Sequence, residues 1–147
     1  MFQNYNQFFK KIFTNFDKSV KEELQMKENE IRVLKVEPHE HPKECILENT
    51  LEALQEAVDG YIDIIGLEDD ICILLNDEGK LIGLEGNRSL GDDILVGNFY
   101  ICGSDAEGNL TSLTDEEIEF YTEMFYEPQE FTQEEVEETT RIDFYLF

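Results

Sequence analysis

The chain has 147 residues and a formal net charge of -24, with 35 Asp and Glu against 11 Lys and Arg. This length suits one domain with a buried core plus an appendage, and 41% apolar content places the chain among globular proteins. No run of 18 apolar residues exists and polar residues interrupt the N-terminal stretch, so we expect no membrane span and no secretory signal.

Residues 1–30 are predicted to form an N-terminal amphipathic helix. Apolar side chains recur at three- and four-residue steps from Phe2 to Val20, and five Lys residues lie elsewhere on the helix surface. The first 36 residues carry a charge of about +2 and the remainder -26, so we treat residues 1–30 as a separate appendage. Its apolar stripe would pack on its own domain, form a homodimer with a second copy, or dock into a partner. Membrane association is not expected, because anionic lipid repels the acidic domain.

A compact α+β domain is predicted over residues 31–126. β-branched and aliphatic side chains predict strands at residues 31–37, 43–47, 61–65, 71–75 and 94–102. The turn at residues 76–79 should fold residues 71–75 back on residues 80–84, and a second turn follows at residues 104–108. The order of elements favours a small, mostly antiparallel sheet with two or three helices.

Capping residues predict the helices of this domain. Asn49 as N-cap with Glu52 at N3 starts a helix that ends at Gly60. Thr114 and Glu117 form a capping box for a helix that runs to about residue 125. Three residues share its predicted apolar face: Ile118, Tyr121 and Phe125.

Residues 127–147 are predicted to be an acidic C-terminal extension. Pro128 breaks the preceding helix, and Thr132 with Glu135 caps another, very acidic helix to about Thr140. The final residues, 142–147, are strongly apolar and must pack on the domain, pair as an edge strand or meet a partner.

The sequence contains no catalytic or metal-binding pattern that stands out. His39 and His41 lie in a Pro-flanked loop, and no further His completes a metal site. There is no nucleophile elbow, P-loop or Gly-rich fingerprint, and carboxylates are too abundant for an acid–base pair to be chosen. Cys45, Cys72 and Cys102 are interpreted as small buried residues in a reducing cytoplasm. We therefore predict a non-enzymatic protein with no cofactor.

A series of motifs resembles one known family, the domain of unknown function 3846. The motifs are Val33-Leu-Lys-Val-Glu-Pro38, Leu51-Glu-Ala-Leu-Gln-Glu-Ala-Val-Asp-Gly-Tyr-Ile62, Asn76-Asp-Glu-Gly-Lys80, Gly83-Leu-Glu-Gly-Asn-Arg88, Val96-Gly-Asn-Phe99 and Leu113-Thr-Asp-Glu-Glu-Ile118. The resemblance covers about residues 31–126. It implies a small cytoplasmic accessory protein of phages or mobile elements of Gram-positive bacteria, and it supplies no catalytic residues.

Two polar residues of these motifs are candidate ligand-binding residues. Asn87 and Arg88 would hold a small anionic ligand, because a guanidinium offers a bidentate fork. The alternative is structural: Asn76 and Gly79 are ordinary turn residues, and Arg88 pairs with a carboxylate.

The acidic C-terminal half indicates a partner. Residues 89–140 contain 15 carboxylates and no Lys or Arg, and such one-sided charge repels phosphates, so direct nucleic-acid binding is not expected. One helix over residues 115–138 would space its eleven carboxylates by about 3.3 Å, close to the roughly 3.4 Å between phosphates of a DNA strand. The alternative is a set of solvated acidic helix faces. The spacing of the interleaved aromatic residues makes them mostly core: Phe120, Phe125, Tyr126 and Phe131.

We therefore expect a cytoplasmic counter-defence inhibitor of anti-CRISPR or anti-restriction type. Its acidic surface would imitate nucleic acid and block a basic surface of a host nucleic-acid-handling protein. The predicted partner-binding carboxylates are Asp115, Glu116, Glu119, Glu123, Glu134, Glu135, Glu137 and Glu138. The alternatives are a regulatory or assembly adaptor that binds through the N-terminal helix, and a binder of a small anionic ligand.

Overall fold

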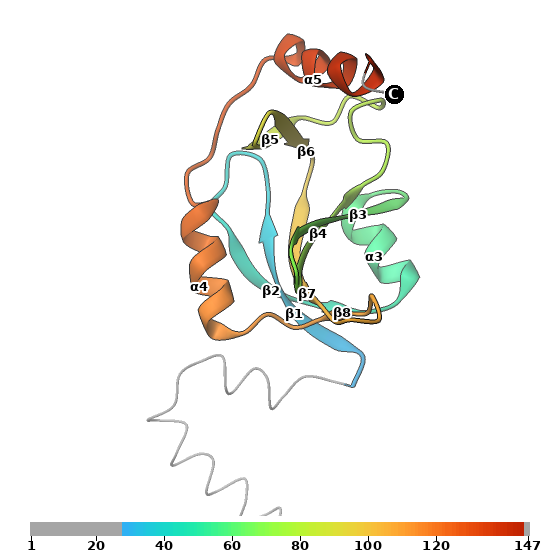
Figure 1. Ribbon diagram of the computed structural model, residues 1–147, viewed down its shortest axis with the longest axis vertical. Helices are drawn as coiled ribbons and strands as arrows, with labels where there is room; N and C mark the ends of the chain where they lie inside the picture. Colours follow the sequence, from blue (N-terminus) through green and yellow to red (C-terminus); the bar gives the residue numbers. More distant parts are fainter. Residues whose placement is uncertain (1–27, 146–147) are drawn as a thin grey trace, which may run out of the picture.

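The computed structural model describes residues 28–145, and the side chains of residues 28–140 (Figure 1). The elements in chain order are β1 Glu30–Val36, β2 Lys43–Glu48, α3 Leu51–Val58, β3 Ile62–Glu68, β4 Ile71–Asn76, β5 Gly86–Leu90, β6 Asp93–Val96, β7 Phe99–Ser104, β8 Leu110–Thr111, α4 Asp115–Met124 and α5 Gln133–Tyr145. A helix is predicted for residues 1–30, of which residues 1–27 lie outside the described residues. Glu30, the last residue of that prediction, belongs to β1.

The main sheet is antiparallel at every described pairing. Its strands follow the order β2-β1-β7-β4-β3, and the short strand β8 also belongs to this sheet and pairs with β7. A second, two-stranded sheet contains β5 and β6. Three helices accompany the sheets within residues 28–145, so the predicted α+β class with a mostly antiparallel sheet is confirmed.

Alternation along the central strands divides the core into two layers. On β4, Ile71 and Ile73 face α4, whereas Cys72 and Leu74 face α3. The two helices accordingly lie on opposite sides of the sheet (Figure 1). All six residues of β4 are buried, because this strand lies between β7 and β3 and is covered on both faces.

The β5–β6 hairpin connects the main core to α5. Leu95 of β6 packs into the core beneath α4, while its neighbours Ile94 and Val96 pack against Val136 of α5. Phe131, from the connection before α5, adds to this outer cluster. The acidic C-terminal extension therefore covers apolar residues of the hairpin and lies above it in Figure 1.

The predicted hairpin between residues 71–75 and 80–84 is wrong. Residues 77–83 continue as a turn, in which Ile82 N–H donates to Glu78 O at 3.0 Å, and β4 pairs with β3 and β7 instead. Leu81 and Ile82 are 78% and 56% exposed, so their side chains do not pack into a core as those of a sheet strand would.

The single strand predicted over residues 94–102 is also wrong. Gly97, with φ of 69°, separates β6 from β7, and a residue with a side chain rarely adopts that backbone conformation.

Of the two helix caps predicted for the domain, one is confirmed. The Thr114–Glu117 capping box is present, but Thr50, not Asn49, caps α3, with its side chain accepting from Ala53 N–H. Helix α5 continues to Tyr145, beyond its predicted end at residue 140.

Candidate functional site

Helix α4 presents four of the predicted partner-binding carboxylates. The capping box fixes the start of the helix, and Ile118 and Tyr121 bury its inner face against the sheet. Carboxylates on the other positions therefore point to solvent. Four of them are exposed: Asp115, Glu116, Glu119 and Glu123.

Helix α5 presents the other four. Its start is fixed by Thr132 and Glu135, because Glu135 N–H donates to the Thr132 hydroxyl at 3.1 Å and Glu135 accepts from Thr132 N–H at 3.1 Å. Val136 and Thr139 face inward and are buried. The exposed carboxylates on the remaining positions are Glu134, Glu135, Glu137 and Glu138.

The two acidic helices do not form one continuous line of charge. Helix α4 ends at Met124 and α5 begins at Gln133, with a non-helical connection between them. They occupy separate parts of the molecule (Figure 1). The break predicted at Pro128 is therefore confirmed, the regular spacing of an idealised single helix over residues 115–138 is not realised, and the acidic surface consists of two patches.

Basic side chains do little to offset these patches. Among residues 28–140, Lys35, Lys43 and Lys80 form ion pairs with carboxylates, and Arg32 and Arg88 are buried. Five carboxylates on the two helices make no side-chain hydrogen bond or ion pair with another described residue: Glu116, Glu119, Glu123, Glu134 and Glu137. These five charges are available to a partner.

Arg32 joins β1 to the start of α4. Its guanidinium donates to Asp115 at 2.6 Å and to Glu44 at 3.2 Å, so Asp115 is already paired. Burial lowers the pKa of Arg32, but the hydrogen bonds and charges of Asp115 and Glu44 outweigh burial and leave the pKa above its ordinary value. Arg32 therefore stays charged, and Asp115 contributes to a fixed internal pair.

The uncompensated charge predicts that salt stabilises the fold. Raising the NaCl concentration from about 0.1 M to about 1 M shortens the screening length from about 10 Å to about 3 Å, which weakens repulsion among exposed carboxylates. We expect a rise in melting temperature of about 4 °C, corresponding to about 1 kcal/mol. Thermal unfolding followed by circular dichroism measures this. A melting temperature that does not rise with NaCl would contradict net self-repulsion.

Asn87 and Arg88 lie in the interior, where they bind the backbone. The Asn87 amide donates to Val36 O at 2.9 Å and to Gly97 O at 2.8 Å. The Arg88 guanidinium donates to Phe125 O at 2.9 Å, to Glu40 O at 2.6 Å and to Asn87 Oδ1 at 2.8 Å. Arg88 thus supplies positive charge at the C-terminal end of α4, where helix carbonyls favour a cation.

These contacts favour a structural role for both residues. Burial lowers the pKa of Arg88, and the charge of Glu127 partly offsets this. Arg88 borders a hollow of about 420 Å³, but Glu123 and Glu127 line the same hollow, and their charges oppose an anionic ligand.

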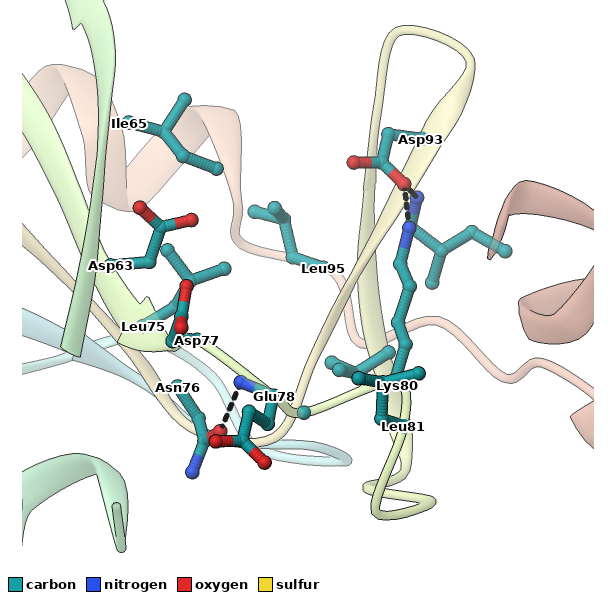
Figure 2. A pocket seen from close by; sticks show the side chains of 13 residues that line it. Asp63, Ile65, Leu75, Asn76, Asp77, Glu78, Lys80, Leu81, Asp93 and Leu95 are labelled. Carbon is teal, nitrogen blue, oxygen red and sulfur yellow. Dashed lines mark hydrogen bonds and ion pairs between the residues drawn. The ribbon is translucent and has the colours of Figure 1, made fainter. Parts of the chain in front are cut away.

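A second hollow, of about 180 Å³, lies between β3, the end of β4 and β6 (Figure 2). Lys80 forms an ion pair with Asp93 on one side, and Asp63 and Asp77 lie on the other. Asn76 accepts from Glu78 N–H at 2.8 Å and donates to Val58 O at 2.9 Å, so it closes the turn and anchors α3. Sequence analysis missed this hollow because its acidic residues come from distant segments.

The histidines contact an acidic and an aromatic side chain, and two of the three cysteines are buried. His39 pairs with Glu85 at 2.5 Å, and His41 stacks on Tyr126 with ring centroids 4.1 Å apart. Among the described residues, no three His, Cys, Asp or Glu side chains are grouped so as to hold a metal ion. Cys72 and Cys102 are free and buried opposite each other on β4 and β7. Burial raises the pKa of Cys45 to about 11, so its thiol is protonated at neutral pH.

The sequence profile of a family described as a domain of unknown function (DUF3846) matches residues 31–126. The chain belongs to the DUF3846 family. This confirms the resemblance drawn from the motifs. No curated protein and no solved structure matches the chain.

The DUF3846 match separates the two acidic helices. It begins in β1 and ends just after α4, so α5 lies outside it. The motif residues Asn76, Asn87 and Arg88 are all buried within the DUF3846 domain and all bind backbone carbonyls. Within residues 28–145, none of α3, α4 and α5 has the length and apolar character needed to cross a bilayer.

Proposed function

We propose that this DUF3846 protein is a non-enzymatic accessory protein of a phage or mobile element that inhibits a host nucleic-acid-handling protein in the bacterial cytoplasm. Its target would be a CRISPR effector, a restriction enzyme or a similar complex. The observation that supports the proposal is the mismatch in charge availability. The eight predicted carboxylates of α4 and α5 are exposed and five of them pair with no described residue, whereas the basic side chains of residues 28–140 are buried or ion-paired.

The two patches would act on a nucleic-acid channel through their charge. A channel that binds phosphates presents Lys and Arg, and the exposed carboxylates would pair with these side chains in place of phosphates. Opposite charge speeds diffusional encounter, while buried apolar contacts determine which partner is held. The imitation therefore depends on two acidic helices held in fixed positions, not on a uniform ladder of charges.

Affinity capture identifies the target. Tagged protein is incubated with host lysate, washed at low and then raised salt, and the retained proteins are identified by mass spectrometry. Recovery of a nuclease that competing DNA displaces supports the proposal. Recovery of a phage structural or regulatory protein, indifferent to DNA and lost when residues 1–28 are removed, would instead favour an adaptor that binds through the N-terminal segment.

Charge removal on α5 tests the mechanism once the target is known. We expect a variant with Glu134, Glu135, Glu137 and Glu138 changed to Gln to inhibit about tenfold less well, because it loses four charges that would pair with Lys and Arg of the target. Its inhibition should also depend less on salt concentration. Gln at position 135 still supports the helix cap. A dose–response assay at two salt concentrations measures both effects.

The matched control removes the same charge from other surfaces. It combines Glu52→Gln and Glu56→Gln on α3 with Asp77→Asn and Glu78→Gln in the turn after β4, all four exposed. This control should retain inhibition. Equal potency of the α5 variant and the natural protein would remove the α5 patch from the mechanism.

A further inference from the structure

The outer face of α4 carries two large apolar side chains among its carboxylates. Phe120 and Met124 are 58% and 53% exposed. They follow Glu116 at four-residue steps, so these three residues form one row on the helix surface. Glu119 and Glu123, at neighbouring positions, lie beside this row and are exposed. The spacing-based assignment of Phe120 to the core is wrong, because Ile118 and Tyr121 already occupy the inward positions. The same assignment is wrong for Tyr126, which is 45% exposed.

The Phe120 ring has an aromatic neighbour on the helix. It packs edge-on against Tyr121, with ring centroids 5.0 Å apart and planes at 84°. Tyr121 is itself fixed, because its hydroxyl donates to Glu68 at 2.8 Å. An aromatic side chain has only two χ angles and so loses little conformational freedom on binding, which suits Phe120 to serve as an anchor.

A hollow of about 300 Å³ beside Phe120 has a composition suited to a basic side chain. Phe120, Tyr121 and Ile71 supply apolar wall, and carboxylates supply the rest of the lining: Glu68, Asp70, Glu116 and Glu117. Among the described residues that line it, none is basic. An Arg side chain pairs with carboxylates through its guanidinium and stacks on aromatic rings, so this lining matches both of its properties.

We propose that the outer face of α4 docks on a protein surface with an apolar pocket ringed by Arg residues, which receives Phe120 and Met124 and places Arg against the carboxylates. The inference rests on the proposed function and names the partner's chemistry. Charge favours this occupant over two others, because the acidic domain of a second copy, with a charge of -26 over residues 37–147, and an anionic bilayer both repel the same face. Aromatic and Met side chains are also those enriched at interface centres.

Two synthetic helical peptides test this docking. They have the same length and the same number of Arg residues, but one carries Leu along one face where the other carries Gln. Fluorescence anisotropy measures the affinity of each labelled peptide for the full chain. We expect the Leu peptide to bind about tenfold more tightly, because only it offers apolar contact to Phe120 and Met124.

Paired variants assign the preference to α4. Phe120→Ser with Met124→Gln should remove the preference and retain binding of the Gln peptide, since no charge changes. The control is Leu81→Ser with Ile82→Gln, which alters an apolar pair in the turn after β4 that is more exposed than Phe120 and Met124, and it should retain the preference. Circular dichroism confirms that both variants are folded.

The remaining outcomes overturn the inference. They are equal affinity of the natural chain for both peptides, an unchanged preference in the α4 variant, and an equal loss in both variants. These failures are distinct from failure of the proposed function, which is judged by target inhibition in the α5 charge variant. If that variant loses inhibition while the peptides bind equally, only the docking inference falls.

Discussion

Replacing Arg88 by Met is expected to lower the free energy of unfolding by about 3 kcal/mol. Arg88 is 1% exposed, and its guanidinium satisfies the backbone carbonyls of Phe125 and Glu40. Met fills most of the same volume but donates no hydrogen bond, so both carbonyls lose a charged donor, and each buried unsatisfied group costs about 1–3 kcal/mol. Urea unfolding measures the change as a shift of the midpoint at constant slope.

The control for this experiment is Lys43→Met. Lys43 is also basic and also lies near residue 40, where it pairs with Glu40 at 3.2 Å, but its side chain is 58% exposed. An exposed ion pair contributes less than about 1 kcal/mol, so this variant should remain close to the natural protein. If Arg88→Met costs no more than Lys43→Met, Arg88 is not the internal tie that the geometry indicates, and a ligand-binding role regains support.

The elements that could be predicted from sequence are those determined by local chemistry. The Thr114–Glu117 box defines α4 because both of its hydrogen bonds lie within four residues. Alternating apolar residues likewise predict β1, which begins at Glu30, one residue before its predicted start. Such signals need no knowledge of the rest of the chain.

The errors arise where distant contacts decide the structure. β4 pairs with β3 on one edge and with β7 on the other, so neither edge is left for the predicted hairpin partner at residues 80–84. β5 was not predicted, because a Gly-Asn-Arg-Ser-Leu segment has a weak strand pattern and acquires its strand conformation by pairing with β6. Neither the pairing of β4 nor that of β5 can be predicted from the periodicity of the sequence.

The candidate site shows the same division. Exposure of the carboxylates follows from their positions on capped helices, which sequence specifies. The local sequence does not specify which groups the basic residues bind, because Arg32 is 83 positions from its partner Asp115 and Arg88 is 37 positions from its partner Phe125. The unbalanced surface charge of α4 and α5 therefore becomes visible only when the fold shows which cations are already engaged.

Val136→Asp is expected to lower the free energy of unfolding by about 3 kcal/mol, although it only adds one more carboxylate to a helix that already carries several. Val136 is 1% exposed and packs against Ile94 and Val96 of β6. A carboxylate at this position must be desolvated without a partner, or α5 must leave the hairpin and expose both β6 residues. Urea unfolding and limited proteolysis of the connection at residues 125–132 measure the two routes. Glu137→Asp is the control, because it places Asp at the adjacent exposed position.

The same variant separates position from charge in the proposed mechanism. Val136→Asp adds one negative charge to the α5 patch, so an inhibitor that acted through net charge alone would bind its basic target at least as well. An inhibitor that needs α5 held against β6 would bind less well, because Glu134 and Glu137 lose their fixed placement. Weaker inhibition by Val136→Asp, with full inhibition by Glu137→Asp, would show that α5 contributes as a positioned helix, although it lies beyond the DUF3846 match. Undiminished inhibition would show that its charge suffices without its packing.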